Sequence, residues 1–328
     1  MKKILLAAVA ALAIVGCTQN EEIEKAGEKA EINFGTVVKN STRAAITDDA
    51  VLKKSGFTVY AYNTGTKKMA DIAAKGLDTP FMSKVAATHD EVKGWELANG
   101  PYYWPFSDKV QIFAYATVEG AEYKLNDADI YPTITYSVKS NASEQVDFVV
   151  AKLIDQEKSD VDVNLSFSHA LTQVNFSAKG SSDDFTYTIT SLTIGGIAGS
   201  GTYSFAGNEW IVGSDLTATY TYPITKDIQV SGTTVKDLKL EDGALMLIPQ
   251  DMTADTKVVV SYNVFSGGVK INEVADEVPL AGTTNWKAAT KIRYTLTLSK
   301  EGAKVSFTPQ IGPWAENDTP VAPTTPTE

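Results

Sequence analysis

Apolar and polar residues alternate in short runs along most of this chain, and turn residues separate the runs. The pattern is clear in residues 56–62 and stops at Asn63, Thr64 and Gly65, which favour a turn. Because successive side chains of a strand point to opposite faces, such runs predict half-buried strands. Further runs occupy residues 81–85, 95–97, 110–115, 131–138, 145–151, 161–167, 174–176, 185–189, 192–194, 201–205, 216–222, 244–248, 257–264, 292–298 and 305–307. Only residues 70–76 suit a helical turn, so the sequence predicts an all-β protein of the sandwich or barrel type.

The first foldable segment, residues 31–39, predicts a strand with Ile32, Phe34 and Val38 on its buried face. A polar loop follows, and it contains Arg43, one of only two arginines in the chain. A cut at this exposed basic residue, between Arg43 and Ala44, would release this strand. We therefore expect a first strand that can be removed.

A charged stretch at residues 152–160 interrupts the strand pattern and predicts a domain boundary. Two β-sandwich domains are expected, at residues 31–158 and 159–314. Residues 315–328 are rich in Pro and Thr and predict an extended tail.

The N-terminus predicts export as a lipoprotein. Two lysines precede an apolar run that is too short to span a bilayer, so residues 1–16 are interpreted as a signal peptide. The run ends in a lipobox whose Cys17, the single cysteine of the chain, would receive the lipid. Residues 17–30 form an acid-rich tether that carries too little apolar surface to fold. This organisation predicts a location on the surface-exposed side of the outer membrane and excludes an internal disulfide.

Composition and spacing argue against most chemistry. A formal net charge of −11 opposes nucleic-acid binding, which needs a basic face. The only histidines, His89 and His169, lie in different predicted domains, so neither a histidine-rich metal site nor a Ser-His-Asp triad is expected. His169 is interpreted as a packed or hydrogen-bonded histidine at a strand end. We expect no enzyme activity, no cofactor and no metal.

Several spaced residues together resemble the fimbrillin family, the lipoprotein precursors of type V pilins in Bacteroides-type bacteria. The resemblance covers nearly the whole mature chain and rests on the lipobox, the early Phe and Thr-Arg-Ala, Phe57, Val59, Ala61, Tyr62, residues 103–105 and 112–115, Leu165, Phe167, residues 169–171, Val174, Phe176, Gly201, Tyr203, Trp210, residues 247–250, Trp286, Tyr294 and Leu298.

The resemblance implies two tandem transthyretin-like β-sandwich domains and no catalytic function. It also implies that an arginine-specific protease removes the first strand and that a C-terminal strand of the next subunit fills the groove. On this sequence the cut would follow Arg43. The expected partners are other pilin subunits, the outer membrane through the lipid, the protease, and a host or bacterial surface ligand.

The candidate donor strand is residues 305–311. Its apolar residues Val305, Phe307 and Ile311 have the same relative spacing as Ile32, Phe34 and Val38. A row of unpaired backbone groups favours any strand of matching alternation. The other interpretation is that residues 305–311 form the last strand of their own domain.

Two functions remain open at this point. The first is a subunit, or a tip or anchor component, of a cell-surface pilus that serves adhesion. The alternative is a glycan-binding surface lipoprotein that uses Trp95, Tyr102, Tyr103 and Trp104 as a stacking platform. Aromatic residues beside a proline at a strand end more often close the edge of a core, which favours the pilus interpretation.

Overall fold

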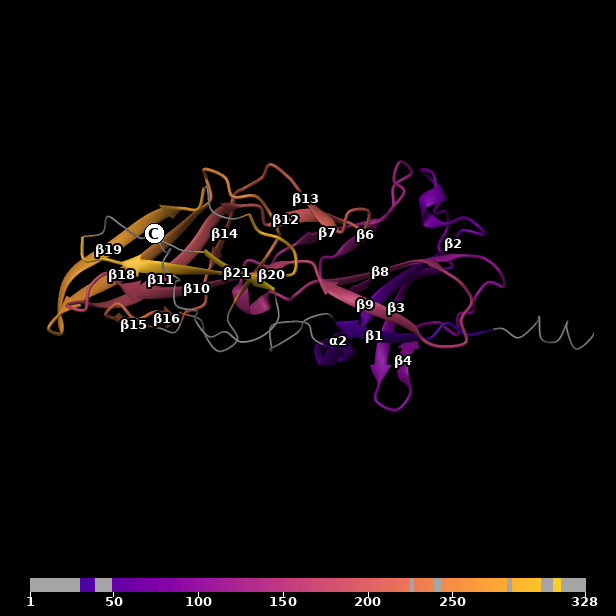
Figure 1. Ribbon diagram of the computed structural model, residues 1–328, viewed down its shortest axis with the longest axis horizontal. Helices are drawn as coiled ribbons and strands as arrows, with labels where there is room; N and C mark the ends of the chain where they lie inside the picture. Colours follow the sequence, from indigo (N-terminus) through magenta and orange to yellow (C-terminus); the bar gives the residue numbers. More distant parts are fainter. Residues whose placement is uncertain are drawn as a thin grey trace, which may run out of the picture.

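The computed structural model describes residues 30–38, 49–224, 227–238, 244–281 and 285–301, together with the backbone of 309–313. The predicted signal peptide, nearly all of the tether, the tail, and the residues Cys17, Arg43, Ala44, Val305 and Phe307 lie outside this set. The described part is elongated and almost entirely β (Figure 1).

A seven-stranded sheet forms the N-terminal half. In sheet order its strands are β1 (Phe34–Val38), β9 (Val163–His169), β8 (Val149–Gln156), β5 (Val110–Ala116), β2 (Phe57–Asn63), β3 (Met82–Asp90) and β4 (Gly94–Leu97). All neighbouring strands are antiparallel except β1 and β9, which run parallel.

A four-stranded sheet covers one face of the seven-stranded sheet. Its order is β13 (Glu209–Val212), β12 (Ser200–Ser204), β7 (Thr133–Ser137) and β6 (Glu122–Lys124). Aromatic rings join the two layers: Tyr60 of β2 stacks on Tyr123 of β6 at 3.7 Å between centroids, and Phe113 of β5 meets Phe205 at 5.2 Å. These pairs belong to a large buried cluster that continues into the C-terminal half.

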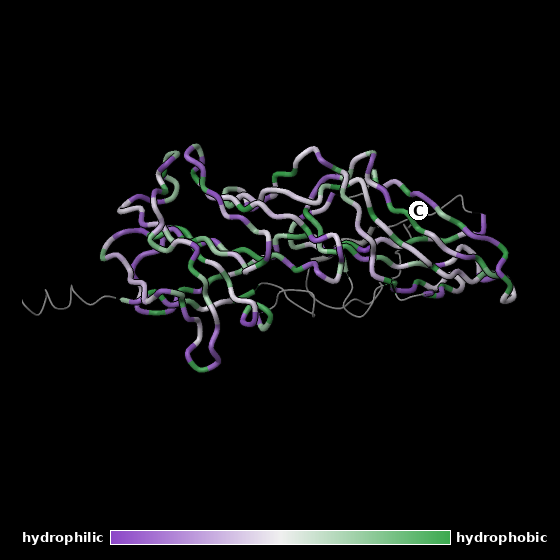
Figure 2. Tube along the Cα trace, turned by 180° about the vertical axis from the view of Figure 1, so that it is seen from behind, coloured by the Kyte–Doolittle hydropathy of each residue, from purple (hydrophilic) through white to green (hydrophobic). Residues whose placement is uncertain are grey.

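The C-terminal half contains two five-stranded sheets. One has the order β16 (Lys236–Asp237), β10 (Thr172–Gly180), β20 (Thr290–Leu298) and β21 (Pro309–Pro313), with β17 (Leu245–Leu247) also paired to β10. The other has the order β14 (Ala218–Thr221), β11 (Thr186–Ile197), β18 (Lys257–Ser266) and β19 (Val269–Pro279), with β15 (Ile228–Ser231) also paired to β11. Figure 2 shows hydrophobic and hydrophilic residues alternating along the strands of both halves.

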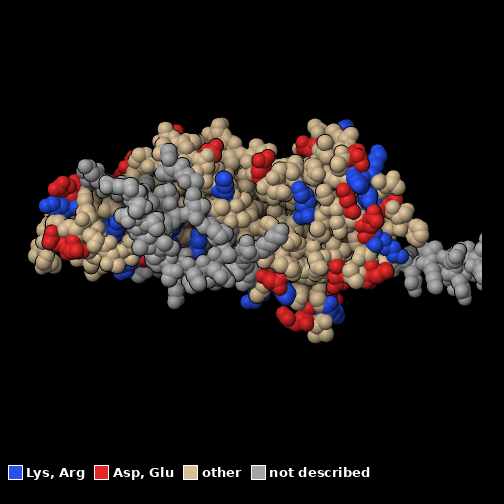
Figure 3. All heavy atoms as spheres, viewed as in Figure 1, with Lys and Arg blue, Asp and Glu red and all other residues tan. Residues whose placement is uncertain are grey.

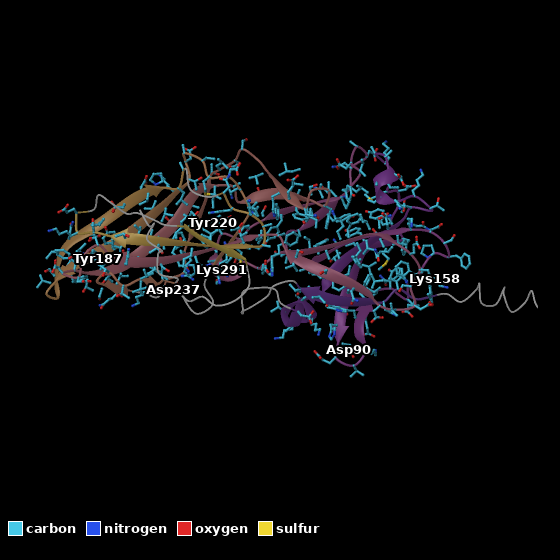
Figure 4. All side chains as sticks on the ribbon, in the orientation of Figure 1. Asp90, Lys158, Tyr187, Tyr220, Asp237 and Lys291 are labelled. Atoms are coloured by element: carbon cyan, nitrogen blue, oxygen red, sulfur yellow. The ribbon has the colours of Figure 1, made fainter. Side chains whose placement is uncertain are left out.

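The predicted domain boundary does not fall between sheets. The charged stretch that begins at residue 152 continues β8 as far as Gln156, and β8 pairs with β9 across the predicted boundary at 158/159. Figure 4 shows Lys158 at the outer end of the N-terminal half, away from the C-terminal half. Strands β12 and β13 also return to pair with β7. The chain passes from the seven-stranded sheet to the C-terminal half at Ala170 and Leu171, between β9 and β10.

The described residues contain little helix, as expected, but the helical segments are not confined to the predicted residues 70–76. The predicted turn at residues 70–76 is a 3₁₀ helix, η1 (Met69–Asp71), and a second, η2 (Ala142–Glu144), lies before β8. Among the described residues the α-helix is α2 (Asp49–Ser55), which the strand pattern did not predict. Asp49 pairs with Lys53 at 2.9 Å, one turn apart, and Leu52 is fully buried, so one buried leucine and one ion pair fix this short helix.

Candidate functional site

The first strand, β1, is an edge strand with a buried face. Ile32 precedes it, and the side chains of Ile32, Phe34 and Val38 are 1%, 4% and 9% exposed, whereas Val37 is 54% exposed. All three buried side chains belong to a second apolar cluster, which also contains Phe57 of β2. The alternation predicted from the sequence is therefore present, and it directs the three residues to one shared core.

Among the described strands, β1 forms a backbone ladder with one neighbour, β9. Its parallel register with β9 pairs Phe34 with Val163 and Val38 with Phe167. Before the strand, Ile32 N donates to Tyr102 O at 2.8 Å, and Trp104 N donates to Ala30 O at 2.9 Å. These contacts attach the strand and the residues just before it to the body of the sheet.

Strand β1 also contacts β4, the strand at the opposite edge of the same sheet. Strand β4 is the last strand in sheet order, yet Trp95 of β4 donates through Nε1 to Thr36 Oγ1 at 3.1 Å. Thr36 Oγ1 also donates to Asp49 Oδ1 of α2 at 3.2 Å. The sheet is therefore rolled so that its two edges meet, and β1 lies at the seam. Among the described residues, this seam is closed by side-chain contacts, and no backbone ladder joins β1 to β4.

A neighbouring side chain closely approaches the glycine at the centre of β1. Gly35 lies opposite Asn164 of β9, and a Cβ built on Gly35 would be 2.4 Å from Asn164 Oδ1. The sequence indicated only a weak point in the strand at this glycine. The structure shows that the missing side chain makes room for the neighbouring amide.

In the sequence, helix α2 directly follows residues 39–48, which contain Arg43. Asp49 is its first residue and makes two contacts, to Thr36 of β1 and to Lys53. The hydrogen bond and the charge of Asp49 raise the pKa of the exposed Lys53 ammonium. Thus β1 and α2, the two described elements that flank residues 39–48, are tied together by a side-chain hydrogen bond.

The second arginine of the chain, Arg293 on β20, is buried. It is 7% exposed, and its Nη1 lies 3.0 Å from Asp237 Oδ1 and donates to Ser177 Oγ at 2.8 Å. Figure 4 shows Asp237 in the C-terminal half of the molecule. Arg293 therefore has a structural role within the five-stranded sheet that contains β10 and β20.

The candidate donor segment falls partly outside the described residues. The backbone of residues 309–313 forms β21, which runs antiparallel to β20 and places Ile311 opposite Ile292. Strand β21 is an edge strand, with β20 as its described neighbour. Its two prolines suit that position, because an edge strand leaves half of its N–H groups outside the ladder.

The aromatic platform considered from the sequence is not assembled as a flat surface. Trp104 is only 6% exposed and joins the same core as β1, while Trp95 is half-buried and bonded to Thr36. Tyr103 is exposed to 41%. The interpretation that these rings close the edge of the core fits their positions.

The two histidines lie on strands of one sheet, not in separate domains as expected. His89 of β3 packs against Trp95 with 5.1 Å between the ring centroids. His169, at the end of β9, is 2% exposed, and its Nδ1 lies 2.6 Å from Asp147 Oδ2, which confirms the hydrogen-bonded histidine predicted there. The described residues contain no group of three or more metal-ligating side chains. Among those same residues, no helix is long and apolar enough to cross a bilayer.

The face shown in Figure 3 carries positive and negative side chains that are interspersed. No single basic patch dominates this face. The distribution agrees with the negative net charge, and neither suggests a polyanion as partner.

A protein family described as fimbrillin-like matches residues 42–314. The chain belongs to the fimbrillin-like family. The match includes every described strand except β1, and it ends where the Pro/Thr-rich tail begins. The resemblance noted from the sequence is thus confirmed.

Other proteins are similar to this fimbrillin-like chain. The fimbrium subunit Fim1C of Phocaeicola vulgatus is 33% identical over 192 residues, which are 52% of this chain and 50% of that protein. The chain therefore matches about half the length of this curated relative. A fimbrial protein from Bacteroides vulgatus has a TM-score of 0.68 at 21% identity and aligns with 88% of this chain and 100% of its own. A candidate cell adhesion protein from Bacteroides uniformis has a TM-score of 0.55 at 18% identity, with coverages of 88% and 99%. At these identities the solved structures show that the fold is shared.

Proposed function

We propose that this fimbrillin-like chain is a structural subunit of a cell-surface fimbrium, exported as a lipoprotein and assembled by strand exchange. In this proposal Cys17 carries the lipid that holds the precursor on the outer membrane, and cleavage after Arg43 separates β1 from the rest of the chain. The polymer then presents its subunits to a host or bacterial surface. The observation that carries the proposal is β1 itself, an edge strand with a buried apolar face directly before the arginine.

The energetics favour replacement of β1 over simple loss. Full burial of a Val, Ile or Phe side chain stabilises a fold by about 1.5–3 kcal/mol, so Ile32, Phe34 and Val38 together contribute about 5–9 kcal/mol as an upper estimate. A domain is typically stable by only about 5–15 kcal/mol. Loss of β1 would therefore leave β9 with an open edge above an exposed core, and a strand of matching alternation would bind there strongly.

Selectivity for Arg43 follows from the position of the other arginine. A protease must bind an extended and accessible segment, and Arg293 lies in the middle of β20 with its guanidinium buried against Asp237 and Ser177. An arginine-specific protease acting on the folded protein would thus have Arg43 as its target. The start of the family match at residue 42 also supports a functional unit that begins after β1.

The donor in this proposal is the segment 305–311. Part of it forms β21, an edge strand, so it can leave β20 without opening the middle of a sheet. The alternative interpretation, in which this segment is simply the last strand of its own half, describes the same monomer. The two interpretations differ in whether the segment is needed for assembly into oligomers.

Treatment of the purified full chain with an arginine-specific protease tests the proposal. We expect one cut, between Arg43 and Ala44, by mass spectrometry, followed by a ladder of oligomers on gels run without boiling. Arg43→Lys keeps the charge but removes the protease site, so it should remain uncut and monomeric. Ile311→Asp should be cut but should not assemble. Equal assembly by uncut Arg43→Lys would show that release of β1 is not the trigger.

A further inference from the structure

A pocket of about 600 Å³ lies where the four-stranded sheet meets the C-terminal half. Its walls come from β13 and the turn before it, from the residues that follow β17, and from the residues before β20. None of the residues that line the pocket lies on a strand of the seven-stranded sheet. The site is thus separate from β1, and its volume is within the range of pockets that bind small ligands.

Internal hydrogen bonds fix the apolar walls of the pocket. Trp210 donates through Nε1 to Ala170 O, and Trp286 donates through Nε1 to Tyr294 Oη at 3.0 Å. Trp286 N also donates to Gln250 O at 3.0 Å. Both indole N–H groups are therefore engaged with the protein. Trp286 is only 3% exposed and supports the wall from behind, whereas Trp210 is half-buried, so Trp210 is the indole that offers a ligand carbon surface.

Gln250 is part of the same rigid frame. Its side-chain amide donates to Ala198 O at 3.2 Å and to Ile248 O at 3.0 Å, and it accepts from Ala198 N at 2.8 Å. The glutamine is 7% exposed, and its side-chain amide is hydrogen-bonded to backbone groups of the protein. It holds the wall in place, and the groups that could bind a ligand lie elsewhere on the pocket.

The rim of the pocket carries four exposed polar side chains: Asn208, Glu209, Asp251 and Lys287. Within the part of the chain that the structure describes, these four side chains form no hydrogen bond and no ion pair. By contrast, exposed pairs elsewhere are joined, such as Lys257 and Glu277 at 2.6 Å. The rim thus offers two carboxylates that accept hydrogen bonds, one ammonium that donates, and one amide that does both.

We propose that this pocket binds a short neutral glycan of about two hexose units. A pyranose ring has an apolar C–H face and a circumference of hydroxyls, which matches the half-buried indole of Trp210 and the acceptors and donors around it. Carboxylates accept hydrogen bonds from hydroxyl groups with particular strength. Two carboxylates against one ammonium give the rim a negative balance, which disfavours sulfated and sialylated glycans. The aromatic cluster at residues 95–104 has no part in this site.

Titration of the full chain with neutral disaccharides tests the proposal. Lactose, mannobiose, cellobiose, maltose and chitobiose would be measured one by one by calorimetry and by saturation-transfer NMR, with sialyllactose and trilysine as charged probes. We expect saturable binding of at least one neutral disaccharide and none of sialyllactose. If no neutral disaccharide binds, or if sialyllactose or trilysine binds in its place, the proposal is wrong.

Matched variants locate the binding. Glu209→Gln and Asp251→Asn keep the shape of each side chain and should each weaken the disaccharide about tenfold, because each loses a charge-assisted hydrogen bond. Glu91→Gln changes an equally exposed carboxylate in the β3–β4 turn and should leave affinity unchanged. Unchanged affinity in both pocket variants would overturn the assignment. Because Arg43→Lys should bind the disaccharide normally, this result is independent of whether strand exchange occurs.

Discussion

At the scale of single residues, the face on which a side chain lies decides its effect. Phe34 and Val37 belong to the same five-residue strand, but Phe34 is 4% exposed and packs its ring 6.0 Å from that of Phe57, while Val37 is 54% exposed. The sequence assigned Phe34 to the buried face from period-two alternation alone. It could not show that the partner ring would come from β2, four strands away in sheet order.

We expect Phe34→Ala to lower the free energy of unfolding by about 3–5 kcal/mol, the usual cost of truncating a buried phenylalanine. Val37→Ala on the same strand should change it by less than about 0.5 kcal/mol, because that side chain points to solvent. Urea unfolding of the full chain, followed by circular dichroism, measures both. Equal destabilisation by the two variants would mean that β1 is not docked with this face inward.

Spacing along the chain could not reveal the contacts that close the seam. Thr36 meets Trp95 and Asp49, and these residues are 59 and 13 positions away. A half-buried threonine between Phe34 and Val38 on the inward face of a strand gives no sequence signal of this kind. The contacts follow from the roll of the sheet, which local pattern does not encode.

At the scale of elements, alternation predicted the buried strands well and the exposed ones poorly. Strands β2, β5, β9, β18 and β20 lie where their patterns placed them. Strand β19 was missed because only Val274 among its 11 residues is buried, and its sequence does not sustain alternation over its length. Helix α2 was missed because its seven residues bury a single leucine. An element that buries little leaves little periodicity to detect.

The hydrogen bond at the seam should control how readily β1 opens. Trp95→Phe keeps the ring against Phe57 but removes the N–H that Thr36 accepts, a loss of about 1 kcal/mol. We therefore expect amide hydrogen exchange in β1 to become about fivefold faster. Mass spectrometry of peptic peptides that cover residues 31–38 measures this rate.

Trp286→Phe is the matched control for that experiment. It also removes an indole N–H bond, to Tyr294 Oη, but in the C-terminal half. Exchange in β1 should not respond to it. If both variants accelerated exchange equally, the seam bond would have no local role and the effect would reflect global stability.

At the scale of the whole molecule, the two halves share structure that a sequence boundary could not show. The charged residues 152–160 suggested a linker, yet most of them extend β8 or form its turn into β9. Polar composition marks solvent exposure, and a hairpin at the outer end of a sheet is as exposed as a linker. The return of β12 and β13 to the N-terminal half is a long-range pairing that no local pattern reports.

We expect residues 31–158 expressed alone not to fold, because this fragment lacks β9, β12 and β13. Without β9 it loses the described backbone ladder of β1, and without β12 and β13 it loses half of the four-stranded sheet. The full chain should unfold in one cooperative transition seen alike by circular dichroism and tryptophan fluorescence. A dispersed NMR spectrum from the fragment, or two separate transitions in the full chain, would contradict this expectation.

The ladder between β1 and β9 has a consequence for the moment after the proposed proteolysis. A cut within residues 39–48 breaks the covalent link but none of the contacts described for β1, so the nicked molecule would retain its own strand as a bound peptide. Five register pairs with β9 hold this strand, and they would all have to break at once for the strand to leave without a competitor. A displacing strand that enters at one end need break only one pair at a time. Nicked subunits would then accumulate as a stable reserve, and the supply of incoming strands, more than the protease, would set the rate at which the fibre grows.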